Sequence, residues 1–144
     1  MEDWKQELIQ QAQKARTFSY APYSGFLVGA ALLAKNGQVF TGCNIENAAY
    51  TPTNCAERTA FFKAVSEGVR EFRAIAIIGG RAATADGEDT VLEYCAPCGV
   101  CRQVMREFCD ADEFEIILAK SGSEYKTCRL ADLFPDSFGP ENLD

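Results

Sequence analysis

Histidine is absent from the 144-residue sequence. Imidazole is the usual proton carrier near neutral pH and the commonest metal ligand, so its absence excludes Ser-His and Cys-His hydrolases. Any general base is therefore expected to be a carboxylate whose pKa is tuned by its surroundings. Any zinc site must be built from thiolates.

Positive charge and long apolar runs are also scarce. The net charge of −7 and the pI near 4.7 oppose binding to a phosphate backbone, so we expect no nucleic-acid partner. The longest apolar run, Phe26 to Ala34, has about half the length that a bilayer span needs, and the acidic start MEDWKQELIQ is not typical of a signal peptide. We expect no membrane partner, and a single domain over residues 1–144.

The cysteines indicate the redox compartment. Their number, seven, is odd, and without an export signal we expect reduced thiols in a cytoplasmic protein rather than disulfides. Metal ligation or catalysis becomes a more natural use for some of them. Cys43, Cys109 and Cys128 are interpreted as small, buried, apolar residues.

Hydrophobic spacing predicts helices alternating with strands. The expected helices span residues 3–17, 55–67, 98–109 and 130–134, and the expected strands span residues 26–34, 38–43, 72–79, 114–119 and 125–129. Asn36-Gly37 predicts a hairpin between the first two strands, and the residues 44–54 and 80–96 are predicted loops. This order favours an α/β fold, a three-layer α/β/α sandwich with a mixed, mostly five-stranded sheet.

Two short segments, each at an expected helix start, carry metal-binding residue types. Cys98 and Cys101 are three residues apart, which places both thiolates on one helical face, and Cys55 can supply a third thiolate. Helix starts favour thiolate over thiol. Three protein ligands with a fourth position left to water are typical of catalytic zinc, so we expect one Zn²⁺ in each subunit.

A carboxylate and a cation accompany these ligands. Glu57 follows Cys55 by two residues, close enough to hydrogen-bond a water on the metal without ligating the metal, and is the predicted proton carrier. Three thiolates on a divalent ion leave a net negative site, which would hold back the acidity of bound water. Arg58 is the expected compensating cation.

Four segments together resemble the short, homotetrameric cytidine deaminases. They are YSGFLVGAA at residues 23–31, GCNIENAAY at 42–50, CAERTA at 55–60 and PCGVCRQ at 97–103, and the closing LFPDSFGP is similar as well. The resemblance implies a cytidine deaminase-like fold, a homotetramer, and zinc-dependent hydrolytic deamination of cytidine and deoxycytidine in pyrimidine salvage. It places zinc on Cys55, Cys98 and Cys101 and the proton shuttle on Glu57.

The same resemblance implies the substrate contacts. Asn44 and Glu46 would hydrogen-bond the ribose hydroxyls, Phe26 would stack near the pyrimidine, and the backbone of Ala56 would read the base. Three further residues would reach the site of a neighbouring subunit: Ala48, Tyr50 and Phe138. The chain departs from the family pattern in the long segment from Arg81 to Ala96, which carries an extra cysteine, Cys95.

Three alternatives are weighed against this interpretation. A deaminase of another aminopyrimidine is disfavoured by Glu46, which would repel a phosphate, and by Asn44, which a free base would not need. A zinc-stabilised binding module without turnover would require a fourth protein ligand such as Cys95. A thiol redox protein would cycle a disulfide between Cys98 and Cys101 and carry no metal.

Overall fold

A mixed β-sheet forms the middle layer of the protein in a computed structural model that describes residues 3–81 and 92–143. The strand order is β2-β1-β3-β5-β6; β3 and β5 are parallel and the other neighbours on this path are antiparallel. The strands are β1 (Phe26–Ala34), β2 (Val39–Cys43), β3 (Phe72–Arg81), β5 (Glu115–Ala119) and β6 (Tyr125–Arg129). A short β4 (Leu92–Glu93) pairs antiparallel with the end of β3.

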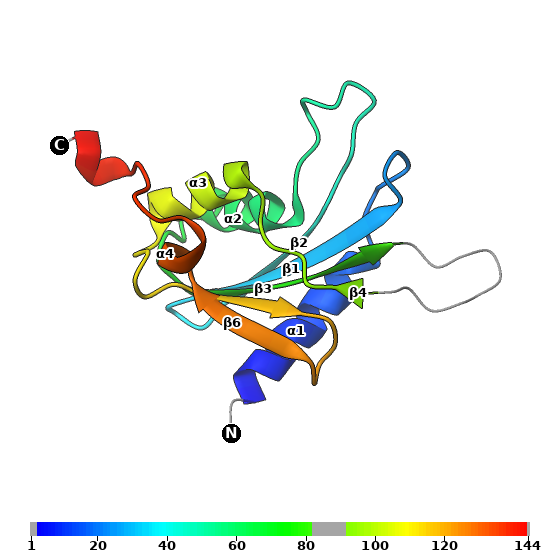
Figure 1. Ribbon diagram of the computed structural model, residues 1–144, viewed down its shortest axis with the longest axis horizontal. Helices are drawn as coiled ribbons and strands as arrows, with labels where there is room; N and C mark the ends of the chain where they lie inside the picture. The colour runs from blue at the N-terminus through cyan, green and yellow to red at the C-terminus, as the bar shows by residue number, and fades with distance from the viewer. Residues whose placement is uncertain (1–2, 82–91, 144) are drawn as a thin grey trace.

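Helices cover both faces of this sheet (Figure 1). α1 (Asp3–Arg16) lies on one face, whereas α2 (Ala56–Ser66) and α3 (Gly99–Phe108) lie on the other, and the short α4 (Leu130–Leu133) follows β6. The predicted α/β/α sandwich and its mixed sheet of five main strands are therefore confirmed. Helical layers on both sides explain why all seven residues from Ala74 to Gly80 are buried.

Each face has its own hydrophobic core. The α1 core contains Leu8, Ile9 and Ala12 from the helix, packed on the sheet at Ala31 and Ile78. The opposite core joins α2, α3 and α4 to the sheet around three phenylalanine rings, Phe61, Phe72 and Phe114. This second core holds the helices on which the cysteine motifs lie.

Two glycines let helices approach the sheet closely. A Cβ on Gly29 would lie 2.0 Å from the Ala12 carbonyl oxygen of α1, and one on Gly42 would lie 2.3 Å from the Ala56 carbonyl oxygen and 2.7 Å from the Ala60 nitrogen. Any side chain at either position would overlap helix backbone. Gly42 therefore allows the first turn of α2 to rest directly on β2.

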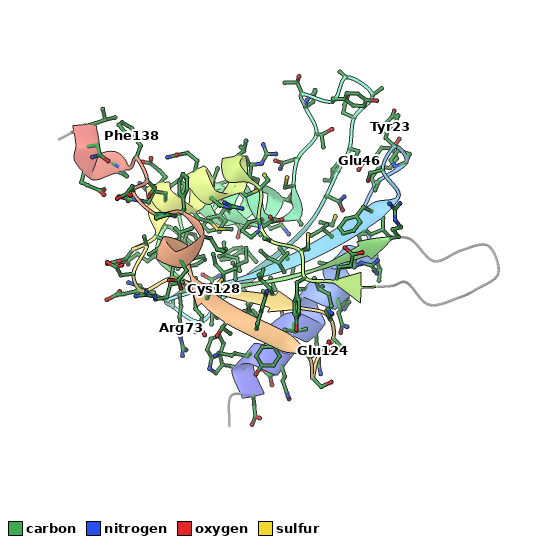
Figure 2. The ribbon with its side chains drawn as sticks, viewed as in Figure 1. Tyr23, Glu46, Arg73, Glu124, Cys128 and Phe138 are labelled. Carbon is green, nitrogen blue, oxygen red and sulfur yellow. The ribbon has the colours of Figure 1, made fainter. Side chains whose placement is uncertain are left out.

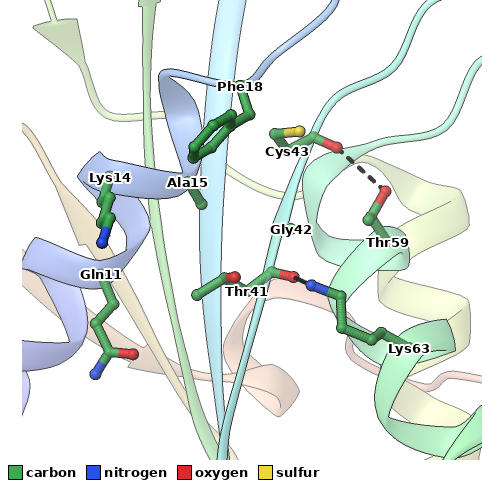
Figure 3. A pocket seen from close by; sticks show the side chains of 9 residues that line it. All are labelled: Gln11, Lys14, Ala15, Phe18, Thr41, Gly42, Cys43, Thr59 and Lys63. Atoms are coloured by element: carbon green, nitrogen blue, oxygen red, sulfur yellow. Dashed lines mark hydrogen bonds between the residues drawn. The ribbon is translucent and has the colours of Figure 1, made fainter.

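Side chains of α2 also fasten this helix to the edge strand (Figure 3). The Lys63 Nζ donates to the Thr41 carbonyl oxygen, and Thr59 Oγ1 donates to the carbonyl oxygens of Cys43 at 3.1 Å and Cys55 at 3.2 Å. Beyond these contacts, a cavity of about 510 Å³ lies between α1 and α2, lined by Phe18 among others. The hydrogen bonds of Thr59 and Lys63 fix α2 relative to the sheet.

The differences from the sequence-based expectation are local. β3 continues to Arg81, and β4 lies inside the predicted 80–96 loop, of which residues 82–91 lie outside the described part of the chain. A short 3-10 helix, η1 (Pro140–Leu143), was not predicted. Cys109 is buried as expected, but the interpretation of Cys43 and Cys128 as buried was wrong, since both are partly exposed. Among the described residues, no helix combines the length and apolarity that crossing a membrane requires.

We expect Gly42→Ala to destabilise the protein by about 1–3 kcal/mol, because the new methyl group overlaps the backbone of α2. Gly122→Ala is the matched control, since a Cβ there meets nothing within 4 Å, and its effect should stay within about 0.5 kcal/mol. Urea unfolding of both variants measures the difference. Equal stability of the two would contradict the close approach of α2 to β2.

Candidate metal centre and active site

Three cysteine sulfurs meet where two helices begin. Cys55 is the N-cap of α2, Cys98 is the N-cap of α3, and Cys101 lies in the first turn of α3. Neither N-cap side chain makes a capping hydrogen bond, so both sulfurs are left to face each other. The Sγ atoms of Cys55 and Cys98 are 3.7 Å apart, those of Cys98 and Cys101 are 3.5 Å apart, and all three lie within 4.8 Å of one another.

This geometry fits zinc. A tetrahedral Zn²⁺ with Zn–S bonds of about 2.3 Å brings its sulfur ligands about 3.8 Å from each other, close to the separations found here. Three cysteines from two rigid helix starts make a thiolate donor set, which suits zinc in a chain without histidine. Within the described residues these cysteines form the one group of three or more His, Cys, Asp or Glu side chains that could hold a metal ion.

A cation and thiol donors favour the thiolate form of Cys55. Hydrogen bonds from Cys101, Arg58 and Cys98 lower the pKa of Cys55 to about 5, against the opposing effect of burial. The Arg58 Nη2 lies 3.4 Å from the Cys55 Sγ. Burial alone would lower the pKa of Arg58, but the hydrogen bond to Cys55 raises it above its usual value. The predicted compensating cation is therefore in contact with a sulfur.

Glu57 is a buried acid beside the sulfurs. It is 4% exposed, although glutamate side chains are almost never fully buried unless they are paired. Burial raises the pKa of Glu57 to about 7, reinforced by the charge of Cys55 and opposed by hydrogen bonds from its own backbone amide and from Cys101. A carboxyl group with this pKa can both accept and release a proton near neutral pH.

Cys95 lies outside the sulfur cluster. Its Cβ packs beside β3, 3.2 Å from where a Cβ on Gly79 would lie, and the Phe26 ring edge is equally close to that point. Burial raises the pKa of Cys95 to about 11, which keeps it a thiol. The fourth ligand that a zinc-stabilised binding module would need is thus not supplied by Cys95 in this arrangement.

Arg102 holds the segment that leads into α3, a role that was not predicted from the sequence. Its Nε donates to the Pro97 carbonyl oxygen at 2.8 Å and its Nη1 to the Leu133 carbonyl oxygen at 3.0 Å. These bonds tie the residue before Cys98 to the end of α4. The second contact spans 31 residues, a separation at which no local sequence pattern gives a signal.

Asn44 and Glu46 lie past the end of β2 and are held by backbone groups. The Asn44 side chain accepts from the Val28 nitrogen at 2.9 Å and donates to the Phe26 carbonyl oxygen at 2.8 Å. The Glu46 carboxylate accepts from the backbone nitrogens of Tyr23 at 3.0 Å and Ser24 at 3.1 Å, and from the Ser24 hydroxyl. Both side chains are therefore fixed in place, and each keeps unused hydrogen-bonding capacity.

The other predicted substrate contacts divide into two groups. Phe26 and Ala56 belong to the body of the molecule: Phe26 packs partly buried against the core and Ala56 is buried at the start of α2. Ala48, Tyr50 and Phe138 are exposed, Tyr50 with a positive φ of 63° and an edge-on contact to Tyr23. Figure 2 shows Phe138 at the opposite end of the molecule from Tyr23 and Glu46. Phe138 therefore cannot join Glu46 in one site within the same chain.

Comparison with known proteins identifies the family. Residues 2–116 match the family model described as the cytidine and deoxycytidylate deaminase zinc-binding region, a segment that contains all three clustered cysteines and Glu57. The chain belongs to this deaminase family. The predicted resemblance to cytidine deaminases and the predicted zinc cofactor are thereby confirmed, whereas the role of each individual side chain stays a prediction.

Similar proteins cover almost the whole chain. A cytidine deaminase of Sporosarcina psychrophila is 49% identical over 138 residues, which are 96% of this chain and 93% of the relative. One of Halalkalibacterium halodurans is 46% identical over 97% of this chain and 98% of the relative. The crystal structure of cytidine deaminase from Burkholderia pseudomallei superposes with a TM-score of 0.78 at 46% identity, covering 92% of this chain and 97% of the other.

We expect serine at Cys55, Cys98 or Cys101 to remove most of the bound zinc, because the thiolate is the ligand and each sulfur belongs to the cluster. Cys95→Ser and Cys128→Ser are matched controls that should keep one zinc per chain. Elemental analysis of the purified variants measures the stoichiometry. Zinc loss in Cys95→Ser would show that the ligand set is wrong.

Proposed function

We propose that the protein hydrolyses cytidine and deoxycytidine to uridine and deoxyuridine with release of ammonia. The observation that carries this proposal is the placement of a buried glutamate, with a pKa near 7, beside three cysteine sulfurs at two helix starts. The substrate is supported by the relatives named cytidine deaminase, which match this chain over nearly its full length.

We propose that Cys55, Cys98 and Cys101 hold the zinc ion and that Glu57 moves the protons. Zinc, when bound, supplies the acidification that makes water a nucleophile at neutral pH. Glu57 would take one proton from the attacking water and deliver it to N3 of the pyrimidine. It would then carry the second proton, from the hydroxyl added to C4, to the amino group, which leaves as ammonia as the C4 carbonyl forms. Arg58, held against the Cys55 sulfur, would offset part of the negative charge of the thiolates.

The nucleoside would be bound by groups that are already fixed. Asn44 keeps one amide proton and one acceptor lone pair, and Glu46 keeps an acceptor position, which together suit a pair of ribose hydroxyls. We assign the pyrimidine to Phe26 and to the backbone of Ala56. The Glu46 carboxylate would repel a 5′-phosphate, which favours nucleosides over nucleotides.

We further propose a homotetramer in which subunits share active sites. Ala48, Tyr50 and Phe138 would contact the substrate of a neighbouring copy, which accounts for exposed aromatic rings on Tyr50 (73%) and Phe138 (57%). We also propose that residues 1–144 work as one domain, in the cytoplasm and in pyrimidine salvage, without nucleic-acid or membrane partners. The net charge of −7 supports the absence of a nucleic-acid partner, because it would repel a phosphate backbone.

Glu57→Gln should retain zinc yet lose at least about 100-fold in kcat, because the amide cannot carry protons between water, N3 and ammonia. Glu67→Gln, the same change at the exposed end of α2, should leave both zinc and turnover unchanged. Ammonia release and elemental analysis are measured on the same samples. Undiminished turnover in Glu57→Gln would refute the assigned role.

A substrate panel tests the nucleoside assignment. We expect deamination of cytidine and deoxycytidine, with CMP and free cytosine at least about tenfold poorer in kcat/KM, because Glu46 disfavours phosphate and the base lacks the ribose contacts. Asn44→Ala should lower kcat/KM for cytidine more than for cytosine. A preference for CMP or cytosine would instead favour the alternative aminopyrimidine deaminase.

A further inference from the structure

The C-terminal tail is fastened to α3 by Arg106. The Arg106 Nε donates to the Ser137 hydroxyl at 2.8 Å, and its guanidinium forms a bidentate ion pair with Glu141. The Arg106 side chain is only 14% exposed, so this pair is partly shielded from water. Bidentate arginine–carboxylate pairs fix orientation as well as distance. The tail on both sides of Phe138 is thereby held to one side chain.

The tail backbone is shaped to receive this guanidinium. A Cβ on Gly139 would lie 2.4 to 2.8 Å from three atoms of the Arg106 guanidinium, so only glycine allows the group to lie against the chain here. The neighbouring Gln103 Nε2 donates to the Phe138 carbonyl oxygen at 3.0 Å. Gln103 and Arg106, on successive turns of α3, thus both hold the backbone around Phe138.

The Phe138 side chain is largely exposed in its own chain. The residue is 57% exposed, although its carbonyl oxygen accepts a hydrogen bond from Gln103 and the residues beside it contact Arg106. Figure 2 places it far from Tyr23 and Glu46, the end of the molecule where the ribose contacts are proposed. Fixing a backbone while leaving its aromatic ring in water gains nothing for a monomer, because the hydrophobic contact is not made.

We propose that Arg106 is a positioning residue for the active site of a neighbouring copy, acting by holding Phe138 in the orientation in which that copy receives it. The inference rests on the proposed deaminase function and on its shared active sites. Arg106 touches neither substrate nor zinc in this proposal. Its contribution appears in a site that belongs to another chain.

A double-mutant cycle tests whether Arg106 acts through Phe138. Phe138→Ala and Arg106→Ala should each lower kcat/KM for cytidine by about tenfold, the loss expected for one aromatic contact. The double variant should be no worse than Phe138→Ala alone, since Arg106 has nothing left to position. Glu107→Ala, an exposed acid next to Arg106 on the same helix, should keep wild-type kcat/KM. Independent, multiplying losses would overturn the proposal.

Mixed oligomers test whether the effect crosses between chains. Subunits carrying Glu57→Gln, with an intact tail, are co-assembled with subunits carrying Arg106→Ala, with an intact Glu57. We expect activity clearly above the sum of the two homo-oligomers. In the mixture, the correctly held Phe138 of a Glu57→Gln subunit can reach the active site of an Arg106→Ala subunit, which still has Glu57. Adding Phe138→Ala to the Glu57→Gln subunit should abolish this gain. No gain in assembled mixtures, or a wild-type enzyme that is active as a monomer, would overturn the proposal.

Folding defects are separated by milder variants. Ser137→Ala removes one acceptor, and Arg106→Lys keeps the charge but loses the bidentate fork. Both should show a several-fold loss in kcat/KM with an unchanged urea midpoint, and full activity in both would refute the role of Arg106 even if Arg106→Ala misfolds. Absence of cytidine turnover in the wild type would refute the proposed function itself, whereas full turnover in these variants would refute only this inference.

Discussion

The meeting of two helix starts on one face of the sheet is the constraint on which the site depends. Cys55 and Cys98 each precede the first helical turn, where backbone amides and the positive end of the helix dipole stabilise an anion. Because the chain has no histidine, the cluster consists of three potential thiolates, and their mutual repulsion must be offset. The two helix starts and the Arg58 contact supply that compensation before any metal is considered.

Building this site costs local stability that the rest of the fold offsets. Cysteine is a poor N-cap, so α2 and α3 each forgo a capping bond worth about 1 kcal/mol. Burying Glu57 penalises its ionised form, which is the reason for its raised pKa. The close packing of α2 against Gly42, and the bonds from Thr59 and Lys63 to β2, hold these unfavourable groups in place.

The sequence predicted the regular elements and the chemistry because both leave local patterns. Helical and strand periodicity, Asn36-Gly37 and the spacing of Cys98 from Cys101 all concern residues close in the chain. β4 was missed because a two-residue strand has no periodicity, and the burial of Cys43 and Cys128 depends on neighbours that the sequence does not reveal.

Contacts made across the fold explain the remaining gaps. The contacts of Arg102 and Arg106 with the tail join residues 31 to 35 positions apart, beyond any motif. Asn44 illustrates a subtler limit. Its motif predicts a ligand contact, yet its side chain is also bonded to the backbone of β1. Only the folded structure reveals that the predicted contact would have to share one amide with these structural bonds.

The direction of the tail follows from the same helix that begins at the metal centre. Arg102 holds Leu133 near the start of α3, and Arg106, about 6 Å further along the helix axis, holds Ser137 and Glu141. The tail therefore lies along α3, where Gln103 also binds the Phe138 carbonyl oxygen. The helix that carries two of the clustered cysteines thus also fixes the backbone on which the exposed Phe138 ring is carried, so the same element orders both the sulfur cluster and a ring that its own chain leaves largely in solvent.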